Sequence, residues 1–193
     1  MSYFRQSQQS LSSDPTASKK KLLRLIRERK WKHAEKLLTS SSHHHFFLHS
    51  FSRCSMQHSI INLALKFEPQ LNIVKKLTML CPNVAYEADC IGQLPLHHAL
   101  QNGASIEVIE HLLALNKGAT DVRNIFGQTP LHLLFYDNAF VPKSCYGQKE
   151  QKYVLKIINK FYAIMPSAML VDDMEERNIL ECVIEKEFDY RSV

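Results

Sequence analysis

The sequence predicts an all-α fold, a short α-solenoid of stacked helix-turn-helix repeats joined by short extended or hairpin links. Two phrases, GQLPLHHAL (92–100) and GQTPLHLLF (127–135), recur at an offset of 35 residues. A second match, at an offset of 84, places NIVKKLTMLCPNVAYEAD (72–89) over KIINKFYAIMPSAMLVDD (156–173). A fixed period in this range is typical of repeat architectures, in which each unit buries its apolar face against its neighbours.

The two offsets divide residues 58–193 into repeat units. They agree if one unit carries an insertion of 14 residues, because 84 is 35 plus 49. We place this insertion within 136–153, which is polar, aromatic and rich in turn-forming residues. The predicted units are therefore 58–88, 89–123, 124–172 with the insertion, and a partial unit at 173–193.

The N-terminal residues are predicted to form a tail and a cap. Residues 1–17 are rich in Ser and Gln, which indicates a disordered tail. Residues 18–57 form a basic helical capping segment, because apolar residues recur at helical spacing within 20–38. This stretch is one helix or two short ones that break near Arg29–Trp31. Residues 39–57 have weak periodicity, so we predict mainly loop there.

Composition and charge set the broad class of protein. The 193 residues have a formal charge of +5, of which 1–53 carry +8 and the remainder −3. Five cysteines, with no Cys-x-x-Cys pair, indicate reduced thiols and an intracellular protein. We see neither a signal peptide nor a run near the roughly 18 apolar residues of a membrane span. A cytoplasmic or nuclear location is therefore expected.

The repeated phrase resembles the signature of a known family. The pattern D-x-x-G-Q-x-P-L-H-x-A, seen best in residues 89–99 (DCIGQLPLHHA) and 124–134 (NIFGQTPLHLL), resembles the ankyrin repeat signature. EVIEHLLALNKGATDV (107–122) resembles the second helix of that repeat and the loop after it. Some positions depart from the pattern: Leu94 replaces Thr, Leu134 replaces a small residue, and PLH becomes IIN at 60–62 and ILE at 179–181.

Residues of the phrase have predicted structural roles. Glycine suits a turn that needs positive φ, proline suits the first helical position, and threonine can cap a helix. Small and apolar residues suit the packed helix face. The resemblance implies that the histidines hydrogen-bond locally and bridge neighbouring repeats. The structural residues are Gly92, Pro95, Leu96, His97, Ala99, Gly127, Thr129, Pro130, Leu131 and His132.

Candidate chemistry is limited to one histidine cluster. His43, His44, His45 and His49 could supply zinc ligands, with Cys54 or His58 as further ligands. No recognisable ligand spacing completes such a site, so a solvated polar loop is the favoured interpretation. We find no motif for nucleophilic catalysis or phosphate binding. The acids at 172–173 and 175–176 are interpreted as solvated charges at a tip. We expect no enzyme activity, metal or cofactor.

The resemblance implies a non-catalytic protein-protein interaction module, a scaffold or adaptor. Ankyrin repeats bind partners through the tips between repeats and the concave face of the first helices. The expected contacts are Lys66, Phe67, Cys90, Ile91, Gln93, Gln101, Asn102, Ile125, Phe126, Gln128, Tyr136 and Asp137. An apolar pair at a tip, Ile125–Phe126, either contacts a partner or folds back onto its neighbour. The insertion offers further aromatic candidates in Phe140, Tyr146 and Tyr153.

A second interpretation assigns function to the basic front helix. There the protein is an electrostatic adaptor that binds anionic membrane or nucleic acid. Solvated lysines and arginines on a capping helix are the ordinary alternative. The cationic residues are Lys19, Lys20, Lys21, Arg24, Arg27, Arg29, Lys30 and Lys32.

Overall fold

The computed structural model describes residues 15–39, 59–135 and 148–184, and it is helical with no strand in these ranges. The predicted all-α class is therefore confirmed for the described residues. The α-helices are α1 (Pro15–Arg27), α2 (Trp31–Thr39), α4 (Ile60–Leu65), α5 (Leu71–Leu80), α6 (Pro95–Gln101), α7 (Ile106–Leu115), α8 (His132–Phe135) and α9 (Gln148–Ile164). The 3₁₀ helices are η2 (Pro82–Tyr86), η3 (Lys117–Thr120) and η5 (Pro166–Leu170), and residues 179–184 are also helical.

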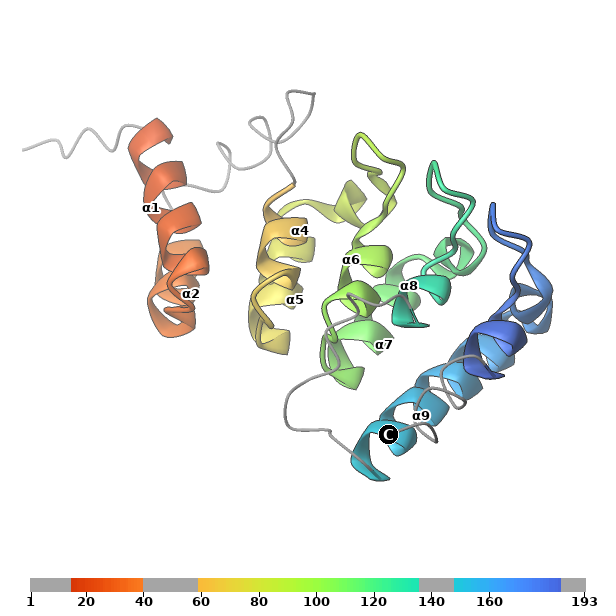
Figure 1. The fold of residues 1–193 in the computed structure, drawn as a ribbon. Helices are drawn as coiled ribbons and strands as arrows, with labels where there is room; N and C mark the ends of the chain where they lie inside the picture. The colour runs from red at the N-terminus through yellow and green to blue at the C-terminus, as the bar shows by residue number, and fades with distance from the viewer. Residues whose placement is uncertain (1–14, 40–58, 136–147, 185–193) are drawn as a thin grey trace, which may run out of the picture.

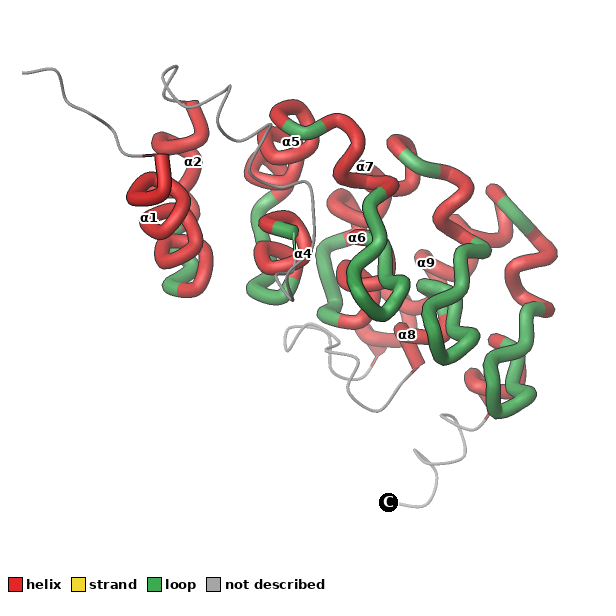
Figure 2. Tube along the Cα trace, turned by 90° about the horizontal axis from the view of Figure 1, so that it is seen from above, coloured by secondary structure: helices red, strands yellow, loops and turns green. Residues whose placement is uncertain are grey.

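The helices lie in pairs, and the pairs follow one another in a row from the N-terminus to the C-terminus (Figure 1). α1 packs on α2, α4 on α5 and α6 on α7. The first helices α4, α6 and α8 pack in succession, as do the second helices α2, α5 and α7. Three loops at 89–93, 124–128 and 173–177 project on one side, where Figure 2 shows them next to each other. We call these loops the tips.

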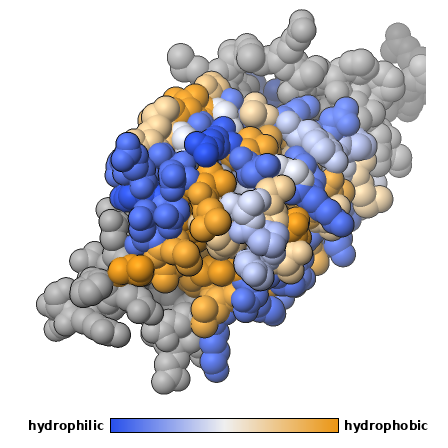
Figure 3. All heavy atoms as spheres, turned by 90° about the vertical axis from the view of Figure 1, so that its right-hand side faces the viewer, coloured by the Kyte–Doolittle hydropathy of each residue, from blue (hydrophilic) through white to orange (hydrophobic). Residues whose placement is uncertain are grey.

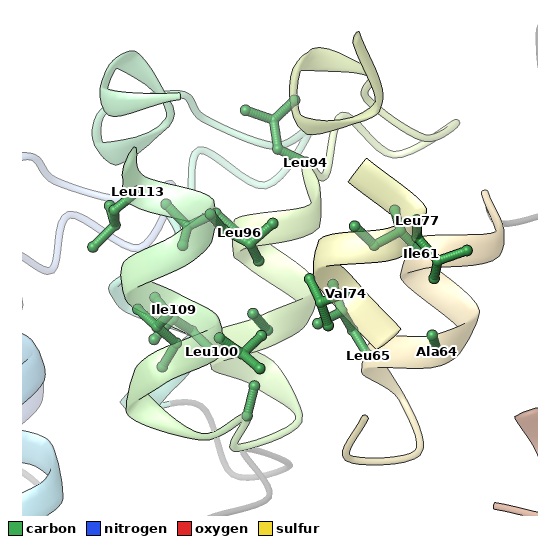
Figure 4. Packing of buried hydrophobic residues seen from close by; sticks show 14 of the residues in the cluster. Ile61, Ala64, Leu65, Val74, Leu77, Leu94, Leu96, Leu100, Ile109 and Leu113 are labelled. Carbon is green, nitrogen blue, oxygen red and sulfur yellow. The ribbon is translucent and has the colours of Figure 1, made fainter. Parts of the chain in front are cut away.

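The core runs along the row between the paired helices. α7 buries Val108, Ile109, Leu112 and Leu113, which share one face of a helix of 3.6 residues per turn. α7 packs on α6, whose buried residues Leu96 and Leu100 lie beside it in Figure 4. Since every pair buries apolar side chains against the next, the core is continuous and contains residues of every described helix pair.

The break inside the basic front segment is confirmed. α1 ends at Arg27 and α2 begins at Trp31, with Arg29 between them at a positive φ of 52°. The amide of Lys30 donates to Leu25 O at 2.9 Å, and this six-to-one bond of a Schellman motif closes the C-terminal end of α1. The predicted disordered tail is wrong for residues 15–17, because α1 already begins at Pro15.

The predicted tail, capping segment, insertion and partial unit at 173–193 lie partly outside the described residues. Ranges 40–58 and 136–147 are not described, so the histidine cluster with Cys54 and His58, and also Tyr136, Asp137, Phe140 and Tyr146, lie outside. The last residues of the predicted insertion, 148–153, are helical, because α9 begins at Gln148. Tyr153 is a buried residue of α9 whose hydroxyl donates to Ala104 O at 2.6 Å, so it is not a surface aromatic.

Candidate interaction surface: the three tips

Each tip is built around the side chain of its first residue. In the first tip, Asp89 Oδ1 accepts the backbone N–H groups of Ile91 at 3.0 Å and Gln93 at 2.9 Å. The amide of Asp89 donates to Gln93 O at 3.0 Å, which closes the five-residue loop. Asp and Asn favour such loops because their short side chains bond to nearby backbone amides.

The other two tips repeat this arrangement at the predicted offsets. Asn124 Oδ1 accepts from Phe126 N at 2.9 Å and from Gln128 N at 3.0 Å. Asp173 Oδ1 accepts from the amides of the third and fifth residues of its own tip at 2.8 and 3.1 Å. The 35- and 49-residue offsets therefore describe three copies of one hydrogen-bonded loop.

The remaining polar side-chain atom of the first residue, Oδ2 of Asp or Nδ2 of Asn, has a different hydrogen-bond partner in each tip. Asp89 Oδ2 pairs with His98 Nε2 at 2.9 Å, and Asp173 Oδ2 pairs with Arg177 Nη2 at 3.1 Å. Asn124 Nδ2 instead donates to the Gln128 side chain at 3.2 Å. Burial alone would raise the pKa of the Asp89 and Asp173 carboxyls, but the bonds from backbone amides and these partners hold both pKa values below their ordinary value.

Neighbouring tips are bonded to each other through the backbone. The amide of Ile125 donates to Ile91 O at 3.0 Å, and the amide of Met174 donates to Phe126 O at 3.3 Å. Each unit therefore presents its tip in a fixed register relative to the tip before it.

The two histidines of the repeated phrase bridge neighbouring units, as the resemblance implies. His97 Nδ1 accepts from Leu94 N at 3.1 Å, and His97 Nε2 lies 3.3 Å from Gln128 O in the next tip. His132 Nδ1 likewise accepts from Thr129 N, and its Nε2 lies 3.1 Å from Arg177 O. Since an amide can only donate and a carbonyl can only accept, both rings are neutral with the proton on Nε2.

Burial supports the neutral form of both rings. Burial lowers the pKa of His97 to about 4, although the bond to Gln128 O favours the charged form. Burial also lowers the pKa of His132, against the opposite effect of its bond to Arg177 O. The Thr129 hydroxyl does not cap the helix backbone as predicted, because it bonds to the ring of His132 at 2.8 Å.

Two glycines are required where consecutive tips meet. Gly92 and Gly127 have φ of 77° and 71°. A Cβ on Gly92 would lie 3.3 Å from the Cα of Asn124, and one on Gly127 would lie 3.0 Å from Met174 N. The third tip has Glu176 in this position, at a φ of 59°. The prediction of positive φ is confirmed for both glycines.

The tips expose only part of the predicted contact set. Ile125 and Phe126 are 54% and 51% exposed, Cys90 is exposed and Ile91 is half-buried. Phe126 is thus not folded away from solvent. Gln93 and Gln128 are buried, because the fifth residue of each tip turns back toward the helix, so we remove them from the contact set. Asp173, interpreted as solvated, is also buried and is the anchor of its tip.

The predicted concave residues are placed at the ends of the first helices. Lys66 is exposed, while Phe67, Gln101 and Asn102 are half-buried. The amide of Asn102 is used locally, since its Nδ2 donates to His98 O at 2.8 Å. These residues do not lie at the tips, so they form a second part of the candidate surface.

The structural residues of the phrase form the packed side of this surface. Pro95 and Leu96 are buried at the start of α6, and Ala99 is fully buried further along it. Pro130 and Leu131 are buried just before α8. Their burial supports the predicted structural roles.

The basic front helices expose most of their charges. Arg24 and Lys30 pair with Glu28 at 3.8 and 2.8 Å, and Arg29 pairs with Glu68 at 3.5 Å. The apolar face of α1 is buried, so it is not available to enter a membrane. On α1 and α2, the exposed cationic residues with no acidic partner within 4.0 Å among the described residues are Lys20, Lys21, Arg27, Lys32 and Lys36.

Comparison with known proteins adds no relative. No protein-family model matches the sequence, and no curated protein is significantly similar to it. Within the described ranges, no three His, Cys, Asp or Glu side chains come together in a way that could hold a metal ion. None of the described helices has both the length and the apolar character needed to cross a membrane.

Proposed function

We propose that the chain is a degenerate ankyrin-type repeat protein, a short solenoid that binds another protein without catalysing a reaction. The tips and the ends of the first helices form the contact surface. This assignment rests on the ankyrin-like phrase, on the recurrence of one loop at the predicted offsets, and on the histidine bridges between units.

The observation that carries this proposal is the exposure of Ile125 and Phe126 on a rigidly held loop. Half of each side chain is in water, while their backbone is fixed by Asn124 and by bonds to both neighbouring tips. An apolar pair held in this way loses little conformational entropy on binding, which favours its use as a contact.

Affinity capture with matched variants tests this proposal. The bait is the full chain, compared with a double variant Ile125→Ala/Phe126→Ala and with Met79→Ala, whose side chain is 78% exposed on α5. A protein that is captured by the native chain and by Met79→Ala, but not by the double variant, supports the proposal. Equal capture by all three baits, at unchanged melting temperature, contradicts it.

The basic front is a second candidate, favoured by the exposure of Lys20, Lys21 and Arg27 on one helix without acidic partners among the described residues. In this alternative α1 and α2 attract an anionic membrane or nucleic acid by charge alone. Binding to phosphatidylserine vesicles or to duplex DNA would then fall steeply with salt, by about one power of salt per neutralised phosphate on DNA. Binding that charge reversal at Lys20, Lys21 and Arg27 leaves unchanged would contradict it.

A further inference from the structure

The last helix, residues 179–184, exposes two apolar positions that the earlier units bury fully or in part. Ile61, Leu96 and Leu131 occupy one position in three successive units, and they are 1%, 2% and 0% exposed. The fourth member of the series, Leu180, is 54% exposed. Ile184 is 55% exposed, one turn along the same face, whereas its counterparts Leu65 and Leu100 are fully buried and Phe135 is half-buried.

The earlier units show what covers these positions. α5 packs on α4, and α7 packs on α6. In Figure 4 the buried residues Leu96 and Leu100 of α6 lie beside α7. No such second helix follows residues 179–184 in the part of the chain that the structure describes. In the units of α4 and α6, the equivalent face is therefore covered by the second helix, α5 or α7.

Two substitutions at this end disfavour a complete further unit as the cover. Glu176 stands where Gly92 and Gly127 allow the next tip to approach within van der Waals contact. Glu181 stands where His97 and His132 donate to the next tip. Its carboxylate accepts from Asn178 N at 2.9 Å, as the ring Nδ1 does, but it has no N–H to offer a following carbonyl. A single helix needs neither of these contacts.

The third tip and this helix together carry a negative net charge, which favours a basic partner. Residues 170–184 contain five acids and one base, Arg177, which already pairs with Asp173 and Glu175. Asp172, Glu176 and Glu181 are exposed. Figure 3, which looks onto this end of the row, shows hydrophobic residues gathered in a patch bordered by hydrophilic ones.

We propose that the face formed by Leu180 and Ile184 is a docking site for one amphipathic helix of a partner protein. The partner helix lies where the second helix of a unit would lie, and its apolar stripe carries flanking Lys or Arg residues that meet the acidic border. This is the helix-in-groove mode of recognition, with anchors spaced by three or four residues. The proposal concerns a different surface from the tips and holds whether or not the tips bind a partner.

A synthetic peptide derived from α7 is the probe for this site. Its sequence is residues 105–117, SIEVIEHLLALNK, with Glu107→Lys and Glu110→Lys, and a fluorophore at its N-terminus. Fluorescence anisotropy against the full-length chain should show saturable binding. Leu180→Asp or Ile184→Asp should weaken peptide binding by about tenfold or more, since each removes an apolar side chain that the bound peptide would bury. The matched control, Met79→Asp, should leave it unchanged.

Further measurements separate this occupant from others. The unmodified peptide, which keeps both glutamates, should bind several-fold more weakly, and added salt should reduce the difference. Where circular dichroism shows that an aspartate variant does not fold, Leu180→Ser replaces it. No peptide binding to the native chain, or binding that the Leu180 variants leave unchanged, overturns the proposal. Concentration-dependent dimers in light scattering that Leu180→Asp dissolves would assign the face to a second copy and also overturn it.

Discussion

The second tip (124–128) and the third tip (173–177) have the same hydrogen-bonded loop but differ where a following unit would meet them. Both are closed by the oxygen of their first residue, Asn124 or Asp173. The second tip has Gly127 and is followed by His132, whereas the third has Glu176 and is followed by Glu181. The first residue therefore builds the loop, while the glycine and the histidine are required by the neighbouring unit.

The largest effect expected from this comparison is that of Gly127→Ala. An alanine there would have a strained positive φ, and its Cβ would lie 3.0 Å from Met174 N. We therefore expect the free energy of unfolding to fall by about 3 kcal/mol. Glu176→Ala, the matched change in the third tip, should cost less than about 0.5 kcal/mol. Urea unfolding followed by circular dichroism measures both. Equal costs would mean that the loop itself requires the glycine.

His97→Ala should have the next largest effect. It leaves Leu94 N and Gln128 O unpaired in a buried place, which should lower the free energy of unfolding by about 2–3 kcal/mol. Glu181→Ala removes one exposed bond to Asn178 N and should cost about 1 kcal/mol or less. A Glu181 variant as unstable as the His97 variant in the same urea titration would contradict the distinction between internal and terminal units.

Mild acid should act on the internal units first. The pKa of His97 is about 4 in the folded chain and near 6.5 when unfolded, so the unfolded chain takes up the proton first. Stability is then fully present above pH 6.5 and is lost toward pH 4, with about 2 kcal/mol gone between pH 7 and 5. The pKa values of Asp89 and Asp173 are lowered from 3.8, so these carboxyls contribute mainly below pH 5. His97→Ala should show a smaller loss; an unchanged slope would assign it to other groups.

The smallest effect is expected from Glu176→Gly. Glycine relieves a φ of 59° but adds freedom to the unfolded chain, so the free energy of unfolding should rise by less than about 1 kcal/mol. A clear loss of stability in the same urea titration would show that the Glu176 side chain makes a stabilising contact.

The sequence was sufficient for the repeated elements because their spacing is set by backbone geometry. Equivalent residues at offsets of 35 and 84 occupy equivalent places in all three tips, and the helix break near Arg29–Trp31 is confirmed. The replacement of PLH by ILE at 179–181 was also visible in the sequence. Its consequence was not, because only the contact between His132 and the next tip shows that a donor is lost at Glu181.

Side-chain direction within the tips was not predictable from the sequence. Gln93 and Gln128 are polar residues of a turn, which favours exposure, yet the loop closure buries them. Tyr153 was assigned to the insertion because a polar stretch precedes it, but α9 begins five residues earlier and buries its ring. Composition alone does not tell a helix start from the end of a polar loop when both are rich in Lys and Gln.

The bonds between tips also determine the order in which the row opens. Since each tip is bonded through its backbone to the tips beside it, we expect opening to be local and to proceed from an end inward, where fewest contacts are lost. The amide of Met174 donates to Phe126 O at 3.3 Å in the last of the three tips. The amide of Ile125 donates to Ile91 O at 3.0 Å between the first and second tips. Deuterium should therefore replace the amide proton of Met174 well before that of Ile125, so that amide exchange records a gradient of local unfolding along the chain.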